Sequence, residues 1–409
     1  MKKLFNKLTS GSVKLVEKYL PDPFIFAIIL TFLVVVISMI VTKTTPIGVV
    51  QAWYGGFWNL LSFSMQMALI LVTGTILATA PLFKKGLGKL ASLPKNKIQA
   101  IIFVNVIAIL ACFVNWGFGL VIGAVFAKEV AKRVKGVDYP LLVASAYAGF
   151  LVWHAGLSGS IPLALATGGA GLGTATGGAV TDAISTNLTI FSTFNLIIFG
   201  VILVTLPLVL SLMHPKDGEA KVIDPKLLED DIEVVVKDRK DMTPAEKLEN
   251  SKIINYLLSA MGFVVIIKYF VDNGFNLNLN IVIFVFLFTA ILLHGTPIAV
   301  VRAVTAAAKN VGGIILQFPF YAGIMGMMVA VGPAGVSLAG AISDMFVNIS
   351  NATTFPLFTF LSAGLVNVFV PSGGGQWAVQ GPIMMPAGLT LGVDAAILEK
   401  AEKRRDYAI

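Results

Sequence analysis

The sequence predicts an all-α polytopic membrane protein that contains two broken hairpins. Composition supports this fold class, because the 409-residue chain is 56% hydrophobic and only 13% charged, whereas a soluble domain carries about 25% charged residues. The mean hydropathy of +0.86 points the same way. Two membrane-length apolar stretches are also interrupted by polar and glycine-rich segments, 115–119 and 367–377. Most of the chain is therefore expected to contact lipid or other membrane helices.

The positive charge of the chain is distributed as in a membrane protein. The net charge is +8 and the pI about 9.4, but the basic residues occur in short blocks between apolar runs. This pattern is typical of cytoplasmic loops under the positive-inside rule, so no nucleic-acid partner is expected. The only cysteine, Cys112, rules out an intrachain disulfide and a cysteine-based metal site. We expect no metal and no cofactor.

The chain begins with elements that lie on and then cross the bilayer. Residues 1–20 carry five lysines and predict a basic amphipathic segment on the inner membrane surface, with a cytoplasmic N-terminus. The apolar runs 23–42 and 57–80 are long enough to span. The next segment, 81–97, carries five lysines and no acid, so we expect a cytoplasmic loop there.

Residues 98–127 predict a hairpin that enters the membrane and returns. They are too long for one simple span, cations flank both ends, and 115–119 (Asn-Trp-Gly-Phe-Gly) breaks the run. Lipid offers no hydrogen-bond partner, so irregular backbone at membrane depth is tolerated only where protein buries it or a polar cavity borders it. The break is therefore a candidate binding site.

The rest of the first half re-enters the membrane and ends in a polar linker. We expect membrane segments at 139–166 and 187–213, joined by a Gly/Thr/Ala-rich outer loop. Together, residues 21–213 form the expected first repeat. Residues 214–252 are the strongly polar stretch and predict a cytoplasmic linker, in which Thr243 starts a small helix as its N-cap.

The second half, residues 253–392, predicts one extra helix and an incomplete second repeat. The expected spans are 253–271, 279–294 and 310–332, followed by a second broken hairpin at 355–392. Arg302 and Lys309 mark an inner loop, and 333–354 predicts an outer segment with a single charge. Residues 393–409 form a charged tail.

The two halves are related by a weak internal repeat. Asn115 lies 49 residues after Gln66, and Asn367 lies 50 residues after Gln317. The predicted topology sends 57–80 inward but 310–332 outward, so the repeat is inverted. Inverted repeats of this kind form secondary transporters that bind substrate near the midplane and expose it alternately on each side.

The repeat also predicts an absence at the C-terminus. Two membrane segments follow the hairpin in the first half, whereas none follows 355–392. We therefore expect that the chain lacks two segments that its own symmetry requires, as a truncated or divergent product would.

Several ordered motifs resemble the bacterial short-chain fatty acid transporter family. They are Leu20-Pro21-Asp22-Pro23, Gly56-Phe57-Trp58-Asn59-Leu60-Leu61, Met65-Gln66-Met67-Ala68-Leu69, 115–119, Asp224-Pro225-Lys226-Leu227-Leu228, Gln317-Phe318-Pro319-Phe320-Tyr321-Ala322-Gly323 and Val370-Pro371-Ser372-Gly373-Gly374-Gly375-Gln376-Trp377. The resemblance extends to about Gly392 and implies secondary transport of small carboxylates such as butyrate or acetoacetate across the bacterial inner membrane. Members of that family continue with further membrane segments and a Gly-Glu-Gln-Trp motif, which residues 394–409 do not resemble.

A carboxylate needs hydrogen-bond donors for its head and an apolar slot for its tail, which helix N-termini in broken segments can supply. We expect it between the two hairpin tips. The candidate substrate-binding residues are Asn115, Trp116, Gly117, Gly119, Asn367, Pro371, Ser372, Gly373, Gly374, Gly375 and Gln376. Close helix packing is the alternative role for the glycines and serines, since membrane helices use them in that way too.

Candidates for cavity lining or coupling are Gln66, His154, Ser158 and Gln317. For the two glutamines, interhelical hydrogen bonding is an equal alternative. His154 lies well inside an apolar segment and is a candidate for carrying a coupling proton. No Asp or Glu lies deep within an expected span, which disfavours a carboxylate proton relay. The alternatives are a symporter driven by H+ or Na+ and an uncoupled carrier. A homodimer is one of the oligomeric states considered.

Other classes of function are weighed against transport of carboxylates. No Ser/His/Asp set, metal cluster or phosphate-binding glycine loop stands in a suitable context, so no enzymatic activity is expected. The expected absence of two C-terminal segments favours a second hypothesis, that the chain is a truncated remnant of a transporter and does not transport. An ion antiporter or channel on the same scaffold is the third hypothesis.

Overall fold

The structure is a computed structural model that describes residues 11, 18–19, 21–216, 218–228 and 238–398. Its regular elements within these residues are helices, and their β pairing is limited to an isolated bridge between Val331 and Ser337. The predictions for most of 1–20, for 229–237 of the linker and for 399–409 of the tail lie outside the described residues. The described part of the chain confirms the all-α fold class.

Seven helical stretches in the described residues are long and apolar enough to cross a membrane. They are Pro23–Thr42, Leu61–Ala78, Lys97–Val114, Tyr139–Thr167, Thr193–Leu212, Pro244–Asn273 and Gly312–Val329. The predicted spans 23–42 and 279–294 coincide with helices α2 (Pro23–Thr42) and α14 (Leu279–His294).

The chain divides into two compact units. The first consists of the described residues of Met1–Leu61, Gly173–Val180 and Ile315–Arg405, and the second of Ser62–Leu172 and Thr181–Ile314. These units are made of segments distant in sequence, so they do not coincide with the predicted repeat boundaries at 21–213 and 253–392. Those boundaries stay predictions about the order of elements along the chain.

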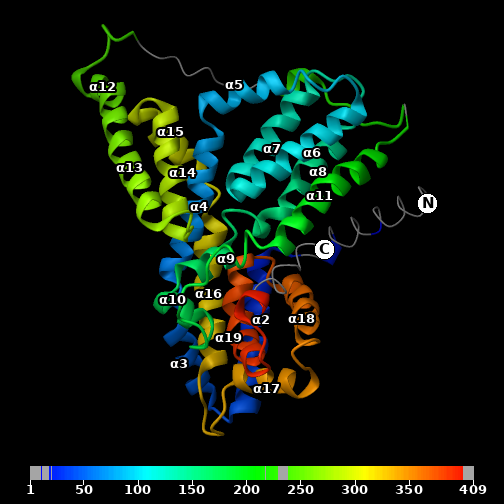
Figure 1. Cartoon of the computed structure of the whole chain (residues 1–409), viewed down its shortest axis with the longest axis vertical. Coiled ribbons are helices and arrows are strands. Elements are labelled where there is room, and N and C mark those ends of the chain that lie inside the picture. Colours follow the sequence, from blue (N-terminus) through cyan, green and yellow to red (C-terminus); the bar gives the residue numbers. More distant parts are fainter. Residues whose placement is uncertain (1–10, 12–17, 20, 217, 229–237, 399–409) are drawn as a thin grey trace. The chain divides into compact units, whose positions relative to one another are not determined.

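The first unit contains both a long N-terminal helix and the second hairpin. Its helices are α2, α3 (Pro46–Gly56), most of α16 (Gly312–Val329), α17 (Leu338–Ile349), α18 (Phe355–Phe369) and α19 (Gly373–Thr390). Helix α19 packs against both α17 and α18 (Figure 1).

The second unit contains the first hairpin and the linker helices. Its helices are α4 (Leu61–Ala78), α5 (Pro81–Leu90), α6 (Lys97–Val114), α7 (Trp116–Ala131), α8 (Tyr139–Ala148), the 3-10 helix η1 (Gly149–Ala155), α9 (Ser160–Thr167), most of α10 (Gly169–Ala175), α11 (Thr193–Leu212), the 3-10 helix η2 (Pro225–Leu228), α12 (Pro244–Glu249), α13 (Lys252–Asn273), α14 and α15 (Pro297–Ala308). Helices α6 and α7 lie side by side, as do α13 and α14 (Figure 1).

Many of these helices start at a polar cap followed by proline. Asp22, Thr45 and Thr243 each precede a proline and accept a hydrogen bond from the first turn of the helix that follows. Proline suits the first helical position because its missing N–H would be unpaired there anyway. The predicted start of α12 is confirmed: Thr243 and Glu246 form a reciprocal capping box.

Short helices occupy the two predicted inner loops and the predicted outer segment. The segment 81–97 contains α5, the region of Arg302 contains α15, and 333–354 contains α17. Each helix has 10 to 12 residues, too short to span a bilayer. In α5 the apolar Leu87 is buried while the three lysines stay exposed. This is the pattern of an amphipathic helix, whereas the density of lysines alone had indicated a loop.

The expected membrane segment 139–166 is not one continuous helix. This stretch is broken into α8, the 3-10 helix η1 and α9, with a non-helical step at 156–159. The chain therefore has a third interruption, in addition to the two hairpin tips.

The order of helices in the first half recurs in the second. The series α2 to α7 and α14 to α19 each run as a long helix, a short one, an 18-residue helix, another short one and two hairpin arms. Gln66 and Gln317 are each the sixth residue of their 18-residue helix. The recurrence is therefore more extensive than the two spans and a hairpin that the sequence predicts.

Candidate functional site

A single residue reverses the chain at the first hairpin tip. Asn115 ends α6 and begins α7, with extended backbone angles of φ −157° and ψ 128°. Its side-chain Oδ1 accepts the backbone N–H of Phe118 at 2.9 Å, and its carbonyl accepts that of Gly119 at 2.7 Å. Asparagine is a preferred N-cap, so the predicted break at 115 is confirmed and its cause is the cap.

The two arms of this hairpin pack closely. A Cβ placed on Gly119 would lie only 2.4 Å from Cys112 Sγ, and one on Gly123 would lie 3.3 Å from Ala108 Cβ. These pairs show that α6 and α7 run antiparallel, as the prediction for 98–127 requires. At Gly119 the absence of a side chain serves this packing.

Helix α4 forms a wall directly against the tip. A Cβ on Gly74 would lie 2.2 Å from Asn115 Oδ1 and 2.6 Å from the backbone nitrogen of Phe118. A Cβ on Gly117 would lie 3.0 Å from Leu71 Cα. The glycines at 74 and 117 therefore bring α4 and the capped turn into backbone contact.

The break in the 139–167 stretch lies against the same tip. The Ser158 Oγ accepts the backbone N–H of Trp116 at 3.0 Å, and the backbone N–H of Leu157 donates to the Phe113 carbonyl at 2.7 Å. The structure thus brings the predicted residues Asn115, Trp116 and Ser158 together. Ser158 was a predicted site residue, but its position in a break was not predicted, although the run Gly156-Leu157-Ser158-Gly159 indicates one.

His154 lies in the 3-10 helix η1 of this broken stretch and is buried. Its Nε2 is 3.0 Å from Ser160 Oγ, and its ring stacks on that of Trp153 with centroids 3.7 Å apart. The imidazole is therefore held in place within a few residues of Ser158.

Aromatic rings surround the tip on this side. The Trp116 ring lies 5.6 Å from that of Trp153 and 6.2 Å from that of Phe150, and Phe150 stacks on Trp153 at 4.9 Å. Phe150 and Trp153 were not among the predicted site residues. Their spacing of three residues, in a stretch that also carries His154, was the available signal.

The tip leaves buried donors without acceptors. Asn115 Nδ2 and Trp116 Nε1 are buried and have no hydrogen-bond partner in the described part of the chain. The backbone N–H of the buried Gly117 also has none there. Each such donor costs about 1–3 kcal/mol when left unpaired. Neighbouring donors beside aromatic rings suit a small anion that has an apolar tail.

The second hairpin tip repeats this arrangement with different residues. Val370, Pro371 and Ser372 join α18 to α19, and Ser372 Oγ accepts the backbone N–H of Gly375 at 3.3 Å. Gly373 and Gly374 are buried, and their backbone N–H groups have no acceptor among the described residues. Two unpaired N–H groups at the start of an 18-residue helix present a partial positive charge.

Gln376 and Trp377 follow in the first turns of α19. Gln376 Nε2 donates to the Ala363 carbonyl at 2.9 Å and to Gln380 Oε1, so this side chain joins the two arms. Trp377 is almost completely buried, and its Nε1 has no partner in the described residues. The predicted role of Gln376 in binding stays a prediction, but its geometry is that of an internal tie.

Asn367 does not lie at the second hairpin tip, where the internal repeat had paired it with Asn115. It belongs to the last turn of α18 and is half-buried, and its side chain makes no hydrogen bond within the described residues. The structural counterpart of Asn115 is Ser372, because both cap the third N–H of the returning arm. The spacing that pairs Asn115 with Asn367 thus falls five residues short of the true counterpart.

The two glutamines make interhelical and local bonds. Gln66 Nε2 donates to Asn280 Oδ1 of α14 at 2.8 Å, which joins two helices of the second unit. Gln317 Oε1 accepts the Tyr321 hydroxyl at 3.3 Å, and a Cβ on Gly375 would lie 2.5 Å from the Tyr321 ring. Gln317 therefore supports the residue against which the second tip packs.

Comparison with known proteins identifies relatives over nearly the whole chain. A family model described as "Short chain fatty acid transporter" matches residues 4–402. A Haemophilus influenzae protein named "Putative short-chain fatty acid transporter" is 45% identical over 396 residues, which cover 96% of this chain and 87% of the relative. An Escherichia coli protein of the same name is 44% identical over 391 residues, with the same coverage of both chains.

Two solved structures share the fold at low sequence identity. The Alcanivorax borkumensis YdaH transporter has a TM-score of 0.58 at 14% identity, and the alignment covers 94% of this chain and 87% of that one. Neisseria gonorrhoeae MtrF, described within a class of antimetabolite efflux pumps, has a TM-score of 0.58 at 15% identity, with 97% and 86% covered. At these identities the likeness concerns the fold alone.

Proposed function

This chain belongs to the short-chain fatty acid transporter family, and from that membership and the geometry of its hairpin tips we propose that it carries butyrate- or acetoacetate-like carboxylates by alternating access. The protein is a multi-pass membrane protein of a family of transporters, not of enzymes. We further propose that it resides in the bacterial inner membrane with a cytoplasmic N-terminus, as the basic inner loops favour.

One observation carries the proposed substrate chemistry. Within the described residues, each hairpin tip leaves buried N–H donors without acceptors. They are Asn115 Nδ2 and Trp116 Nε1 at the first tip, and the backbone N–H groups of Gly373 and Gly374 with Trp377 Nε1 at the second. Such donors are unfavourable unless a ligand or ordered water satisfies them. A carboxylate accepts several hydrogen bonds at once and is favoured at a helix N-terminus.

The aromatic neighbours favour a small acid with a short apolar tail. Trp116, Phe150 and Trp153 offer ring faces and edges beside the donors at the first tip. Neither tip segment, 115–119 or 370–377, contains a lysine or arginine, so the carboxylate is held by neutral donors and dipoles. Neutral recognition is consistent with a substrate that must be released again after each crossing.

The recurrence of the helix order supports alternating access through an inverted repeat. In such transporters, a rigid movement of one part against another exposes the substrate on each side in turn. The coupling ion is left open between H+ and Na+. His154, held near Ser158, is the candidate proton carrier, and dissipating either gradient during uptake would distinguish the two ions.

The experiment that tests the proposal is uptake of labelled butyrate by the full chain in proteoliposomes. Asn115→Ala and Ser372→Ala should each lower uptake by about tenfold or more, because each removes a cap that orders a donor-bearing turn. Trp116→Phe keeps an aromatic ring but removes the indole N–H, which has no acceptor among the described residues, so it tests the donor itself.

Matched controls are Thr205→Ala and Trp58→Phe, whose side chains are exposed. Uptake unchanged in all three tip variants would exclude these residues from the site. Ion flux that needs no carboxylate would favour the antiporter or channel hypothesis, and folded protein without any flux would favour the remnant.

A further inference from the structure

The whole net charge of the protein resides in one segment of the second unit. Residues 81–137 contain nine Lys and Arg residues and one acid, Glu129, which gives a net charge of +8. The rest of the chain holds 21 basic and 21 acidic residues and is therefore neutral. This segment comprises α5 and the hairpin arms α6 and α7, so the charge is confined to the ends of one structural group.

Helix α5 has the dimensions and the exposure of an interfacial helix. It begins three residues after α4 ends and has 10 residues, a length of about 15 Å that cannot cross a bilayer. Leu82, Lys85 and Lys89 lie three and four residues apart, so they share one face. All three are exposed, and Leu82 has 61% of its surface accessible.

The opposite face of α5 is fixed to the hairpin. Leu87 is buried, and the Phe83 ring packs edge-on against that of Phe118 at a centroid distance of 5.0 Å. A Cβ placed on Gly88 would lie 3.9 Å from Nη2 of Arg133, which places the end of α7 beside α5. The exposed lysines of α5 and the cations at 132–135 thus form one basic surface, hereafter the α5 surface.

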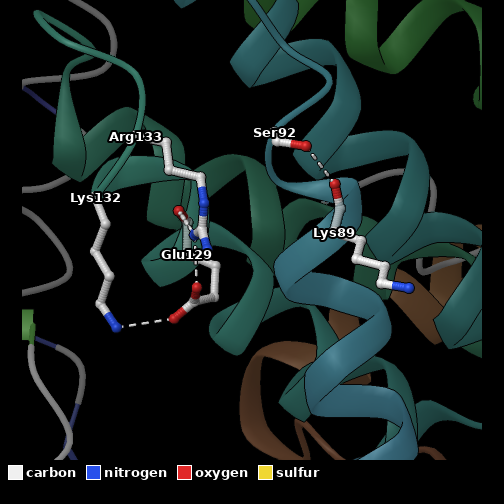
Figure 2. Close-up of polar contacts among 5 residues, drawn as sticks. All are labelled: Lys89, Ser92, Glu129, Lys132 and Arg133. Carbon is white, nitrogen blue, oxygen red and sulfur yellow. Dashed lines mark hydrogen bonds and ion pairs between the residues drawn. The ribbon is translucent and has the colours of Figure 1, made fainter.

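Glu129, the sole acid of the segment, is already neutralised. Its carboxylate accepts from Lys132 Nζ at 2.8 Å and from Arg133 Nη1 at 2.6 Å (Figure 2). Partial burial would raise the pKa of Glu129, but the hydrogen bonds and charges of these two cations outweigh it and lower the pKa. The α5 surface therefore keeps an excess of positive charge at neutral pH.

We infer that the α5 surface is a binding site for anionic phospholipid headgroups, independent of the carboxylate site. Exposed lysines interleaved with exposed leucines, directly after the membrane-length helix α4, match a surface with negative headgroups above acyl chains. Leu90 and Leu93, which are also exposed, extend this pattern beyond Lys89. An acidic protein partner would match the charge but not the exposed leucines beside it.

The test measures lipid retention by the full chain, purified in neutral detergent, with native mass spectrometry. Phosphatidylglycerol and phosphatidylcholine are titrated separately. Each basic residue near an anionic surface contributes about 1 kcal/mol, or roughly a fivefold change. The triple variant Lys84→Gln, Lys85→Gln, Lys89→Gln should therefore weaken phosphatidylglycerol binding by about a hundredfold, with no change for phosphatidylcholine.

Three controls make the result specific. The triple Lys→Arg variant at the same positions should retain binding, because the charge is kept. The triple Lys→Gln variant at Lys226, Lys247 and Lys252, all exposed, removes the same charge elsewhere and should also retain binding. Glu129→Gln removes the negative charge beside Lys132 and Arg133 and should strengthen phosphatidylglycerol binding by about fivefold.

Equal loss of binding in the α5 and control triple variants would overturn the inference, since the effect would then be one of net charge. It would also be overturned if the α5 triple variant lost affinity for soluble polyglutamate while keeping phosphatidylglycerol, because the surface would then fit an acidic protein segment. Uptake of butyrate does not enter the test, so failure of the carboxylate proposal leaves its outcome unaffected.

Discussion

The contact between Gly74 and the cap of the first hairpin is the most direct point at which to test the site. Replacing Gly74 by Ala adds a Cβ 2.2 Å from Asn115 Oδ1, 2.6 Å from the Phe118 nitrogen and 3.0 Å from Asn115 Cγ. The first two separations are far below an ordinary van der Waals contact. The cap therefore has to move, and the Asn115–Phe118 hydrogen bond of 2.9 Å breaks with it.

The expected destabilisation has two parts. Loss of an N-cap bond costs about 1 kcal/mol, and forcing one methyl group into a close-packed contact costs about 1–3 kcal/mol. Together they amount to roughly 2–4 kcal/mol, to be measured from the midpoint of thermal or denaturant unfolding in detergent. Butyrate uptake should fall about tenfold or more, because the displaced cap carries the donors of the proposed site.

The control is the same substitution at Gly200 of α11, where a Cβ meets nothing within 4 Å. Gly200→Ala should be neutral or stabilising by up to about 1 kcal/mol, since alanine favours helix. A double-mutant cycle then isolates the contact: in an Asn115→Ala background, Gly74→Ala meets no Oδ1 and should cost less by about 0.5–3 kcal/mol. Full stability and uptake in Gly74→Ala, or strict additivity in the cycle, would refute this account of the tip.

Three further predictions concern other contacts in the second unit. Ser158→Ala removes the acceptor of the Trp116 N–H and should lower stability by about 1–3 kcal/mol and reduce uptake, whereas Ser158→Thr should retain part of both. Thr243→Ala breaks the capping box with Glu246 and should speed hydrogen exchange in α12 by about fivefold without changing uptake; slowed uptake would reveal an unforeseen role for the linker. The stabilisation that ionised Glu129 gives to the end of α7 should be complete above its ordinary pKa of 4.5 and be lost as the pH falls through its lowered pKa. Exchange rates in the last turn of α7 should follow this change, and a Glu129→Gln variant should not show it.

The elements that the sequence predicts well are those decided by local composition. Spans 23–42 and 279–294 coincide with helices because apolar length and polar or proline boundaries are properties of the chain itself. The break at Asn115 is predictable for the same reason, since asparagine followed by glycines is unfavourable inside a membrane helix.

The elements that sequence reasoning misses depend on what each residue contacts. The ten residues of α5 carry three lysines, and only the burial of Leu87 distinguishes a surface helix from a loop. Similarly, the break at 156–159 is stabilised by Ser158 and Leu157 bonding to the hairpin tip 40 and more residues away in sequence. Patterns within one segment do not contain that contact.

The candidate site likewise has features that local sequence predicts and features that depend on tertiary contacts. Residue types at the tips indicated anion binding. Which of their donors lack acceptors among the described residues depends on the folded geometry of Asn115, Trp116 and Trp377. Gln376 lies in the same motif and is occupied by bonds to Ala363 and Gln380. The pairing of Asn115 with Ser372 rests on the caps that they form and could not come from residue identity.

The two tips differ in the conformational freedom of the residues that connect their helices. One residue reverses the first hairpin, so only two torsion angles are available there, and the position of Asn115 is set once its arms are in place. Three residues connect the second pair of arms, although Pro371 has a fixed φ, which leaves about five adjustable torsions. If this carrier transports acids of different length, we expect the backbone at 370–372 to adjust to them. The turn at 115 is expected to keep the same conformation with each acid.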